Sequence, residues 1–143
     1  MNFKTGSKEA KILEDWKIKI SVLWLFVTVA ILAHQILVLM EPGIITQLMA
    51  GEAEGQKIGP ELILFFAILM LVPLVMAFLS LTLKDSMNCW VNIIVGAVFA
   101  VLWFVGVVDA AQTAYWGGAL MTLSAVVASA LIVWYAWKSK QKA

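Results

Sequence analysis

Charge, arginine and cysteine are all scarce in this chain of 143 residues. Charged residues make up 13% of the sequence, and all ten basic residues are lysines. A net charge of +1 gives no concentrated basic face, so nucleic acid is not expected as a partner. Without arginine, the chain also lacks a side chain that can form bidentate hydrogen bonds to phosphates and carboxylates. Because Cys89 is the single cysteine, an intramolecular disulfide, a CxxC redox pair and a cysteine-based metal cluster are excluded.

Catalytic motifs are missing as well. The sequence contains no HExxH, no GxSxG and no glycine-rich phosphate loop with a lysine. Its single histidine, His34, cannot provide two axial ligands to a haem within one chain, although a homodimer could supply two. We therefore expect no cofactor, no metal site and no enzymatic activity.

Apolar residues dominate what remains, with a hydrophobic fraction of 63% and a mean hydropathy of +0.96. Crossing about 30 Å of hydrocarbon takes roughly 20 residues of helix. Four segments meet this requirement without Lys, Asp or Glu in their middle, and they lack the alternation of barrel strands. The sequence predicts an all-α, up-down bundle of four transmembrane helices in a single domain. The expected parts are tail 1–17, span 18–40, outer loop 41–60, span 61–83, inner turn 84–88, span 89–108, outer loop 109–118, span 119–137 and tail 138–143.

The lysines predict the orientation of these spans. Nine of them fall in the two tails, the start of the first span and the inner turn, whereas Lys57 alone falls on the other side. The positive-inside rule then places both termini in the cytoplasm of a cell with an inner (plasma) membrane. The first span is longer than the apolar core of a signal peptide and follows a tail that carries Glu9, Glu14 and Asp15, so we expect it to be retained.

Short amphipathic pieces flank the spans. In the tail, Leu13, Trp16 and Ile20 recur at helical spacing, which predicts an extension of the first helix at the lipid headgroups. In the first outer loop, Pro42 can start a short interfacial helix that Gly51 ends. Five tryptophans near span ends suggest an aromatic belt: Trp16, Trp90, Trp116, Trp134 and Trp137.

A polar cluster near the outer face is the sharpest candidate site. His34 lies about 7.5 Å from the midplane of the first span, where a polar group must find a partner within the protein. Intramembrane ionisable residues are functional candidates, although the interpretation we favour is a neutral histidine that only specifies helix packing. For Asp109 we likewise favour a solvated carboxylate at the rim. The predicted cluster consists of His34, Gln35, Glu41, Asp109, Gln112 and Tyr115.

Other features concern helix shape and packing. Pro73 in the second span removes a backbone donor and frees the carbonyl of Leu69, which predicts a kink that is either structural or a hinge. Asn88 and Asn92 share a face of the third span and can bond across helices. Small residues provide contact faces at Gly96 with Ala100 and at Ser124 with Ala128.

Several motifs together resemble a known family. They are Glu41-Pro42-Gly43, the runs LMAG and AILMLVPLVMAFLS, NCWVNIIVG in the third span, and WYAW before the basic tail. From about Leu23 onward, the chain is similar to a bacterial and archaeal family of uncharacterised four-helix membrane proteins, known only as a domain of unknown function. The resemblance implies four spans and brings no activity, cofactor or catalytic residue with it.

These observations favour a non-catalytic membrane component, such as an accessory subunit, a scaffold or an assembly partner. Its partners are the lipid bilayer and either a second copy or another membrane protein. The first alternative is a small proton- or solute-coupled transporter that uses the outer polar cluster. The second is a membrane redox protein or enzyme, which the poverty of catalytic groups disfavours.

Overall fold

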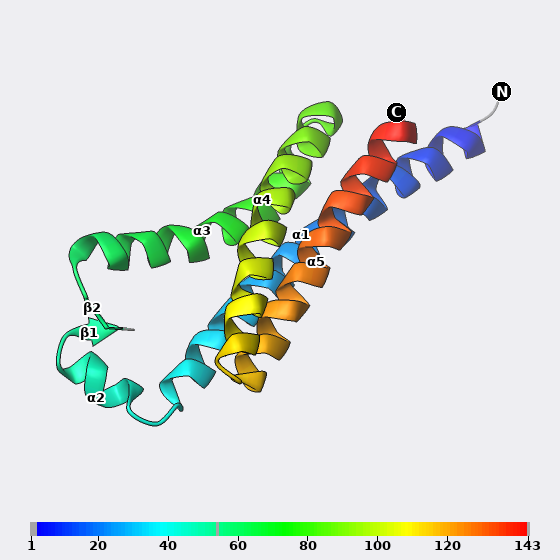
Figure 1. Ribbon diagram of the computed structural model, residues 1–143. Helices are drawn as coiled ribbons and strands as arrows, with labels where there is room; N and C mark the ends of the chain where they lie inside the picture. Colours follow the sequence, from blue (N-terminus) through cyan, green and yellow to red (C-terminus); the bar gives the residue numbers. More distant parts are fainter. Residues whose placement is uncertain (1–2, 54, 143) are drawn as a thin grey trace.

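Helices account for nearly all of the fold (Figure 1). The structure is a computed structural model that describes residues 3–53 and 55–142. Within these ranges four helices are long and apolar enough to cross a membrane, and the all-α fold is confirmed. The elements are α1 (Phe3–Leu39), α2 (Ile44–Met49), β1 (Glu52–Ala53), β2 (Gln56–Lys57), α3 (Pro60–Thr82), α4 (Asp85–Gln112) and α5 (Trp116–Lys142).

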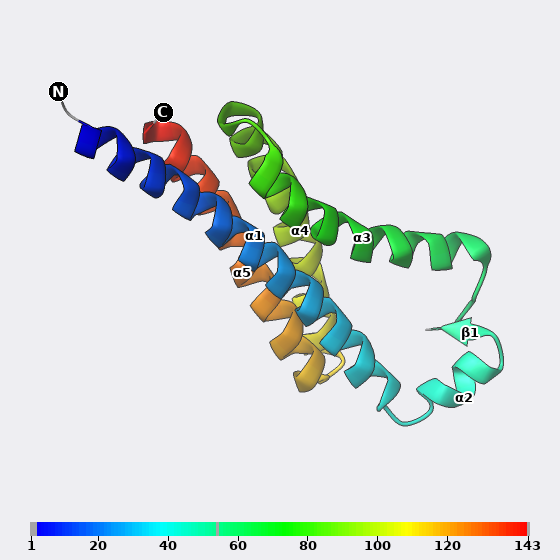
Figure 2. The same cartoon turned by 180° about the vertical axis from the view of Figure 1, so that it is seen from behind.

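The long helices run up and down, so that the chain ends lie together (Figures 1 and 2). We call the end with the start of α1, the end of α5 and the α3–α4 turn the termini end. The opposite end, with α2, the hairpin and the α4–α5 turn, is the loop end. Helix α5 packs along both α1 and α4, whereas α3 packs on the other side of α1. Three of the long helices therefore form the body of the molecule, and α3 lies at its edge.

The body is held together by one large aromatic residue and several small ones. Trp24 of α1 is fully buried and meets Phe99 of α4 edge to face, with ring centroids 5.5 Å apart. On α4, a Cβ at Gly96 would lie 3.0 Å from a methyl group of Val133 and 3.3 Å from one of Ile132. The close α4–α5 approach thus confirms Gly96 as a contact residue.

Helix α3 joins the body along only half of its length. After Pro73, the residues Met76, Ala77 and Ser80 are buried, whereas Leu64 and Ile68 before it are more than half exposed. Both views show α3 bending and its first half leaning away from the other long helices (Figures 1 and 2). A proline inside a helix removes one backbone hydrogen bond and obstructs the preceding turn, which accounts for a bend there.

The loop end carries the short helix that the sequence predicts, with a different start. Helix α2 begins at Ile44, after Gly43 with φ +88°, so Pro42 precedes the helix instead of opening it. This positive φ turns the chain sharply at a residue that has no Cβ to clash. Gly51, at φ +76°, ends the helix as expected. A two-stranded hairpin follows, with Glu52 opposite Lys57 and Ala53 opposite Gln56.

The helices extend beyond the predicted spans. Residues 84–88 and 109–118 contribute mainly to α4 and α5, so the connections at Leu83–Lys84 and Thr113–Tyr115 are short. The described part of the N-terminal tail continues α1 without a break. Trp16 and Ile20 are buried in the core, which corrects the expectation that they form an amphipathic face at the lipid headgroups. The side chain of Leu13 lies outside the described residues.

Candidate functional site

A buried polar network joins α1, α3 and α4 in the half of the molecule nearer the termini end. Nε1 of Trp24 donates to Oδ1 of Asn92 at 2.6 Å, and the Ser80 hydroxyl lies 3.1 Å from the same oxygen. Nδ2 of Asn92 donates to the backbone and side-chain oxygens of Asn88, whose own amide donates to the carbonyl of Ser80 at 2.7 Å. The predicted bonding of Asn88 and Asn92 across helices is therefore confirmed.

A second set of bonds fastens α1 to the end of α3. The Ser21 hydroxyl donates to the carbonyl oxygen of Ala77 at 2.8 Å. Nζ of Lys17 forms an ion pair with Asp85 at 2.6 Å and donates to the carbonyl of Leu83 at 3.2 Å. The bond between Ser21 and Ala77 satisfies a buried hydroxyl within the protein, and together with the partly exposed contacts of Lys17 it fixes the second half of α3 against α1.

At the loop end, an aromatic corner forms between α1 and the α4–α5 turn. His34 follows the buried residues Val27 and Ile31 on the same face of α1 and is itself half-buried. Its ring lies 6.2 Å from the ring of Tyr115, measured between centroids. Gly118 is buried beneath these two rings, because a Cβ there would overlap the Tyr115 ring and lie 3.2 Å from Cε1 of His34.

The phenol of Tyr115 is electrostatically perturbed. Burial raises the pKa of Tyr115 above its ordinary value, and the negative charge of Glu41 raises this pKa further. The aromatic corner thus brings together residues from three of the predicted positions: His34, Glu41 and Tyr115.

The other predicted site residues lie elsewhere. Asp109 and Gln112 are exposed on the last turns of α4. Gln35 is half-buried and faces a pocket on the side of α3. Pro73 is fully buried at the bend of α3.

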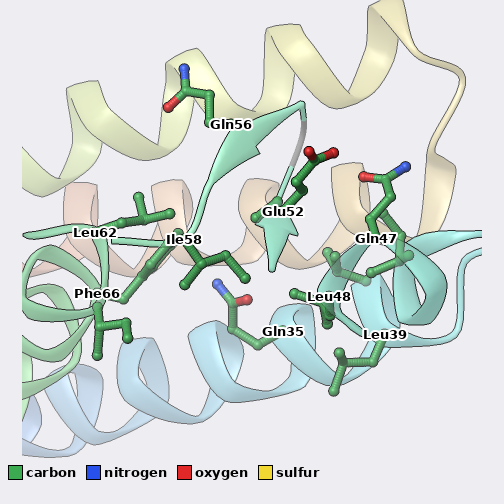
Figure 3. A pocket seen from close by; sticks show the side chains of 13 residues that line it. Gln35, Leu39, Gln47, Leu48, Glu52, Gln56, Ile58, Leu62 and Phe66 are labelled. Atoms are coloured by element: carbon green, nitrogen blue, oxygen red, sulfur yellow. The ribbon is translucent and has the colours of Figure 1, made fainter. Parts of the chain in front are cut away.

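The pocket at the loop end was not anticipated from the sequence. It has a volume of about 390 Å³ and lies between the end of α1, α2, the hairpin and the first turns of α3 (Figure 3). Nine of its lining residues are apolar: Val38, Leu39, Ile44, Leu48, Ala53, Ile58, Leu62, Ile63 and Phe66. Four are polar: Gln35, Gln47, Glu52 and Gln56. The hairpin that carries Glu52 and Gln56 gave no sequence signal beyond Gly51 and Gly55, so this wall of the pocket was missed.

The acidic, histidine and cysteine side chains of the described residues are dispersed. Among residues 3–53 and 55–142, no group of three His, Cys, Asp or Glu side chains could hold a metal ion. The polar side chains described above instead occur in four places. They are the asparagine network, the bonds of Ser21 and Lys17, the aromatic corner, and the rim of the pocket. The fold and these sites define an all-α protein with four candidate membrane-spanning helices, as in a multi-pass membrane protein.

The chain belongs to a family of unknown function, DUF6326, which matches residues 10–143. This finding confirms the resemblance to a domain of unknown function and extends it toward the N-terminus, since the motifs began at about Leu23. No curated protein and no solved structure matches the chain.

Proposed function

We propose that the protein is a non-catalytic assembly component of the plasma membrane, with the termini end in the cytoplasm. Lysines and tryptophans at that end support this placement. Nζ of Lys140 lies 3.6 Å from the ring centroid of Trp90, and Nζ of Lys138 lies 5.1 Å from that of Trp134. Such pairs suit a membrane boundary, where an aromatic ring and an extended lysine each have one apolar and one polar part.

The observation that carries the assembly role is an uncovered apolar stripe on α3. Leu64, Ile68, Leu71 and Val75 recur at helical spacing, and each is more than two-fifths exposed. Beside the bend, Ile68, Leu71 and Val75 line a shallow hollow of about 170 Å³ together with Val72 and Met76. Because helices associate in membranes through close packing of shape, a hollow at an edge helix favours a side chain from a partner helix.

The proposed occupant is an apolar helix of another membrane-spanning protein. A photoactivatable amino acid at Leu71 should form a defined protein adduct in intact cells. The same amino acid at Phe104, an exposed apolar residue of α4, serves as the control. Ile68→Trp should abolish the adduct at position 71 by filling the hollow, while leaving the fold intact. Adducts to lipid alone at both positions, or an adduct that Ile68→Trp leaves unchanged, would contradict the assembly role. An adduct between two copies of this chain would show that the occupant of the hollow is a second copy and not another protein.

A small proton- or solute-coupled transporter is the second candidate. The aromatic corner favours it, because His34 and Tyr115 are ionisable groups brought together near the loop end. The tight contact of α1 with α3 at Ser21 and Ala77 favours a purely structural protein instead, since transport requires access from both sides. Proton flux into proteoliposomes, compared between the protein and His34→Ala, separates the two. Flux that depends on His34 would establish transport.

A further inference from the structure

The pocket at the loop end combines an apolar lining with a polar rim that contains a single charged residue. Apolar side chains come from α1, α2, the hairpin and α3, and Leu62 and Phe66 form its wall on α3 (Figure 3). The charged residue in the lining is Glu52, and the other polar members are three glutamines. Ligand pockets typically pair an apolar lining with a few polar groups that fix orientation, and a volume of about 390 Å³ lies within their usual range.

The rim offers hydrogen-bond acceptors of the kind that suit an ammonium group. A carboxylate accepts hydrogen bonds through both oxygens, and Gln35 and Gln47 can each add an amide oxygen, whereas an ammonium has three N–H donors. Bonds between an ammonium and a carboxylate are charge-assisted and are stronger than neutral ones. Figure 3 shows Gln35 extending from α1 toward Ile58 and the hairpin that carries Glu52.

A positive charge lies next to this acceptor group. Lys57 is directly opposite Glu52 in the hairpin, so the two side chains leave the same face of the ribbon. A ligand whose ammonium meets Glu52 can therefore place a phosphate toward Lys57. This pairing of charges matches a zwitterionic headgroup.

The pocket is also placed to admit a lipid chain. The pocket is lined by α1 from Gln35 to Leu39 and by α3 from Leu62 to Phe66, and further along the two helices are joined by the contact of Ser21 with Ala77. An acyl chain can lie between Leu39 and Phe66 while its headgroup reaches the rim.

From these observations we propose that the loop-end pocket binds a phospholipid with a primary ammonium headgroup, of the phosphatidylethanolamine class. This inference rests on the membrane location proposed above but is independent of the assembly role. The pocket residues Leu62 and Phe66 lie on one face of α3, and the uncovered stripe with Leu64 and Ile68 lies on the opposite face.

The test uses the full chain in vesicles of phosphatidylglycerol that contain a trace of phosphatidylethanolamine with a photoactivatable acyl chain. Labelled peptides should map to the pocket walls on α1 and α3. Unlabelled phosphatidylethanolamine should compete for this labelling, whereas phosphatidylcholine should not, because its quaternary ammonium has the charge but no N–H donor. Equal competition by both lipids would overturn the proposed recognition of the ammonium.

Two pairs of variants sharpen the test. Glu52→Gln removes the charge of the rim and should lower labelling about tenfold, whereas Glu61→Gln, an exposed carboxylate outside the pocket, should not. Leu62→Trp should fill the pocket and abolish labelling, whereas Leu64→Trp should not. Leu64→Trp should instead weaken the partner adduct at position 71, so failure of either proposal can be recognised separately. Labelling that Glu52→Gln and Leu62→Trp leave unchanged would overturn the pocket as the lipid site.

Discussion

Trp24 and Asn92 are joined by a hydrogen bond of 2.6 Å that spans the interior from α1 to α4. The helices that pack directly against α1 are α5 and α3, whereas the backbones of α1 and α4 lie further apart. The indole of Trp24 therefore reaches across the interior from α1 to α4. The same Asn92 oxygen lies within hydrogen-bond distance of Ser80 on α3. One carboxamide therefore connects three of the four long helices.

The first prediction is that Asn92→Ala destabilises the fold by about 1–3 kcal/mol. The substitution removes partners of the buried groups of Trp24 and Asn88, and unsatisfied buried groups cost about this much. Because individual hydrogen bonds in membrane proteins average about 0.6 kcal/mol, we expect a loss in the lower half of this range. Reversible unfolding in mixed micelles measures the change. Gln112→Ala, which alters an exposed carboxamide, should stay within about 0.5 kcal/mol of the parent.

The second prediction concerns the neighbouring glycines of the aromatic corner. Gly118→Ala places a Cβ inside the ring of Tyr115 and should cost about 1–3 kcal/mol, as overpacking does. Gly117→Ala is the matched control, because its Cβ would lie 3.8 Å from that ring, an ordinary contact. Tyr115→Ala should relieve much of the cost when it is combined with Gly118→Ala. If the two glycine variants unfold alike, the close packing at Gly118 is not what holds the corner.

The third prediction is a loss of stability at alkaline pH. Burial and Glu41 raise the pKa of Tyr115 in the fold, so the folded protein keeps a proton that the unfolded chain releases. This contribution to stability is complete below the ordinary tyrosine pKa of about 10 and is lost as the pH rises through the folded pKa. Tyr115→Phe should flatten this part of the pH profile of unfolding.

The chain has only two tyrosines, so phenolate absorbance can be assigned by difference. Subtracting the titration of Tyr115→Phe from that of the parent isolates Tyr115. Glu41→Gln should lower the pKa of Tyr115, because it removes the nearby negative charge. A pKa of Tyr115 that Glu41→Gln leaves unchanged would mean that burial alone perturbs the phenol.

The sequence predicted the four long helices and the bonding of Asn88 and Asn92, because both follow from local composition and helical spacing. Trp24 was missed, although an indole N–H in the middle of an apolar span needs an acceptor and could have been noticed. Pro73 predicted the bend of α3, but the sequence did not predict that the first half of α3 would lie apart from the other long helices. Whether the first half of α3 rejoins the body depends on the loop of residues 41–59, whose hairpin has no strong local signal.

The loop-end sites show the same limit. The sequence placed His34 and Tyr115 at similar heights along the helices, since depth follows from counting residues, and their ring centroids lie 6.2 Å apart. The exposed position of Asp109 depends instead on the rotation of α4 about its axis, which packing against α5 sets. Spacing along one helix cannot reveal that rotation, because it is fixed by contacts between segments.

The fourth prediction is that the termini end faces the cytoplasm and the loop end faces the outside. Because Cys89 is buried, cysteines at exposed positions are needed to test it. Cys89 is 3% exposed, so its failure to react with a maleimide would report burial as much as sidedness. In a Cys89→Ser background, Ser86→Cys at the termini end should resist a membrane-impermeant maleimide in intact cells. Lys57→Cys, at an exposed position of the loop end, should react. The reverse pattern of labelling would place the termini outside.

The last prediction is that Pro73 sets the separation between the first half of α3 and α1. Replacing it by alanine restores a backbone donor for the carbonyl of Leu69 and removes the ring that obstructs the preceding turn, so α3 should straighten. The second half of α3 is anchored by the bonds of Ser21 and Lys17 to Ala77 and Leu83, so the movement should be confined to the first half.

Distances between spin labels measure this directly in a Cys89→Ser background. Labels at Leu64 and Ile36 report the first half of α3 against α1, and labels at Phe78 and Val22 report the second half; all four residues are exposed. Pro73→Ala should shift the first distance and leave the second unchanged. An unchanged first distance would show that the loop of residues 41–59 holds α3 away from α1. A change in both distances would mean that the anchoring bonds do not fix the second half. With the expected result, the lipid labelling of the pocket in Pro73→Ala should fall as well, because the same angle sets the width of the pocket.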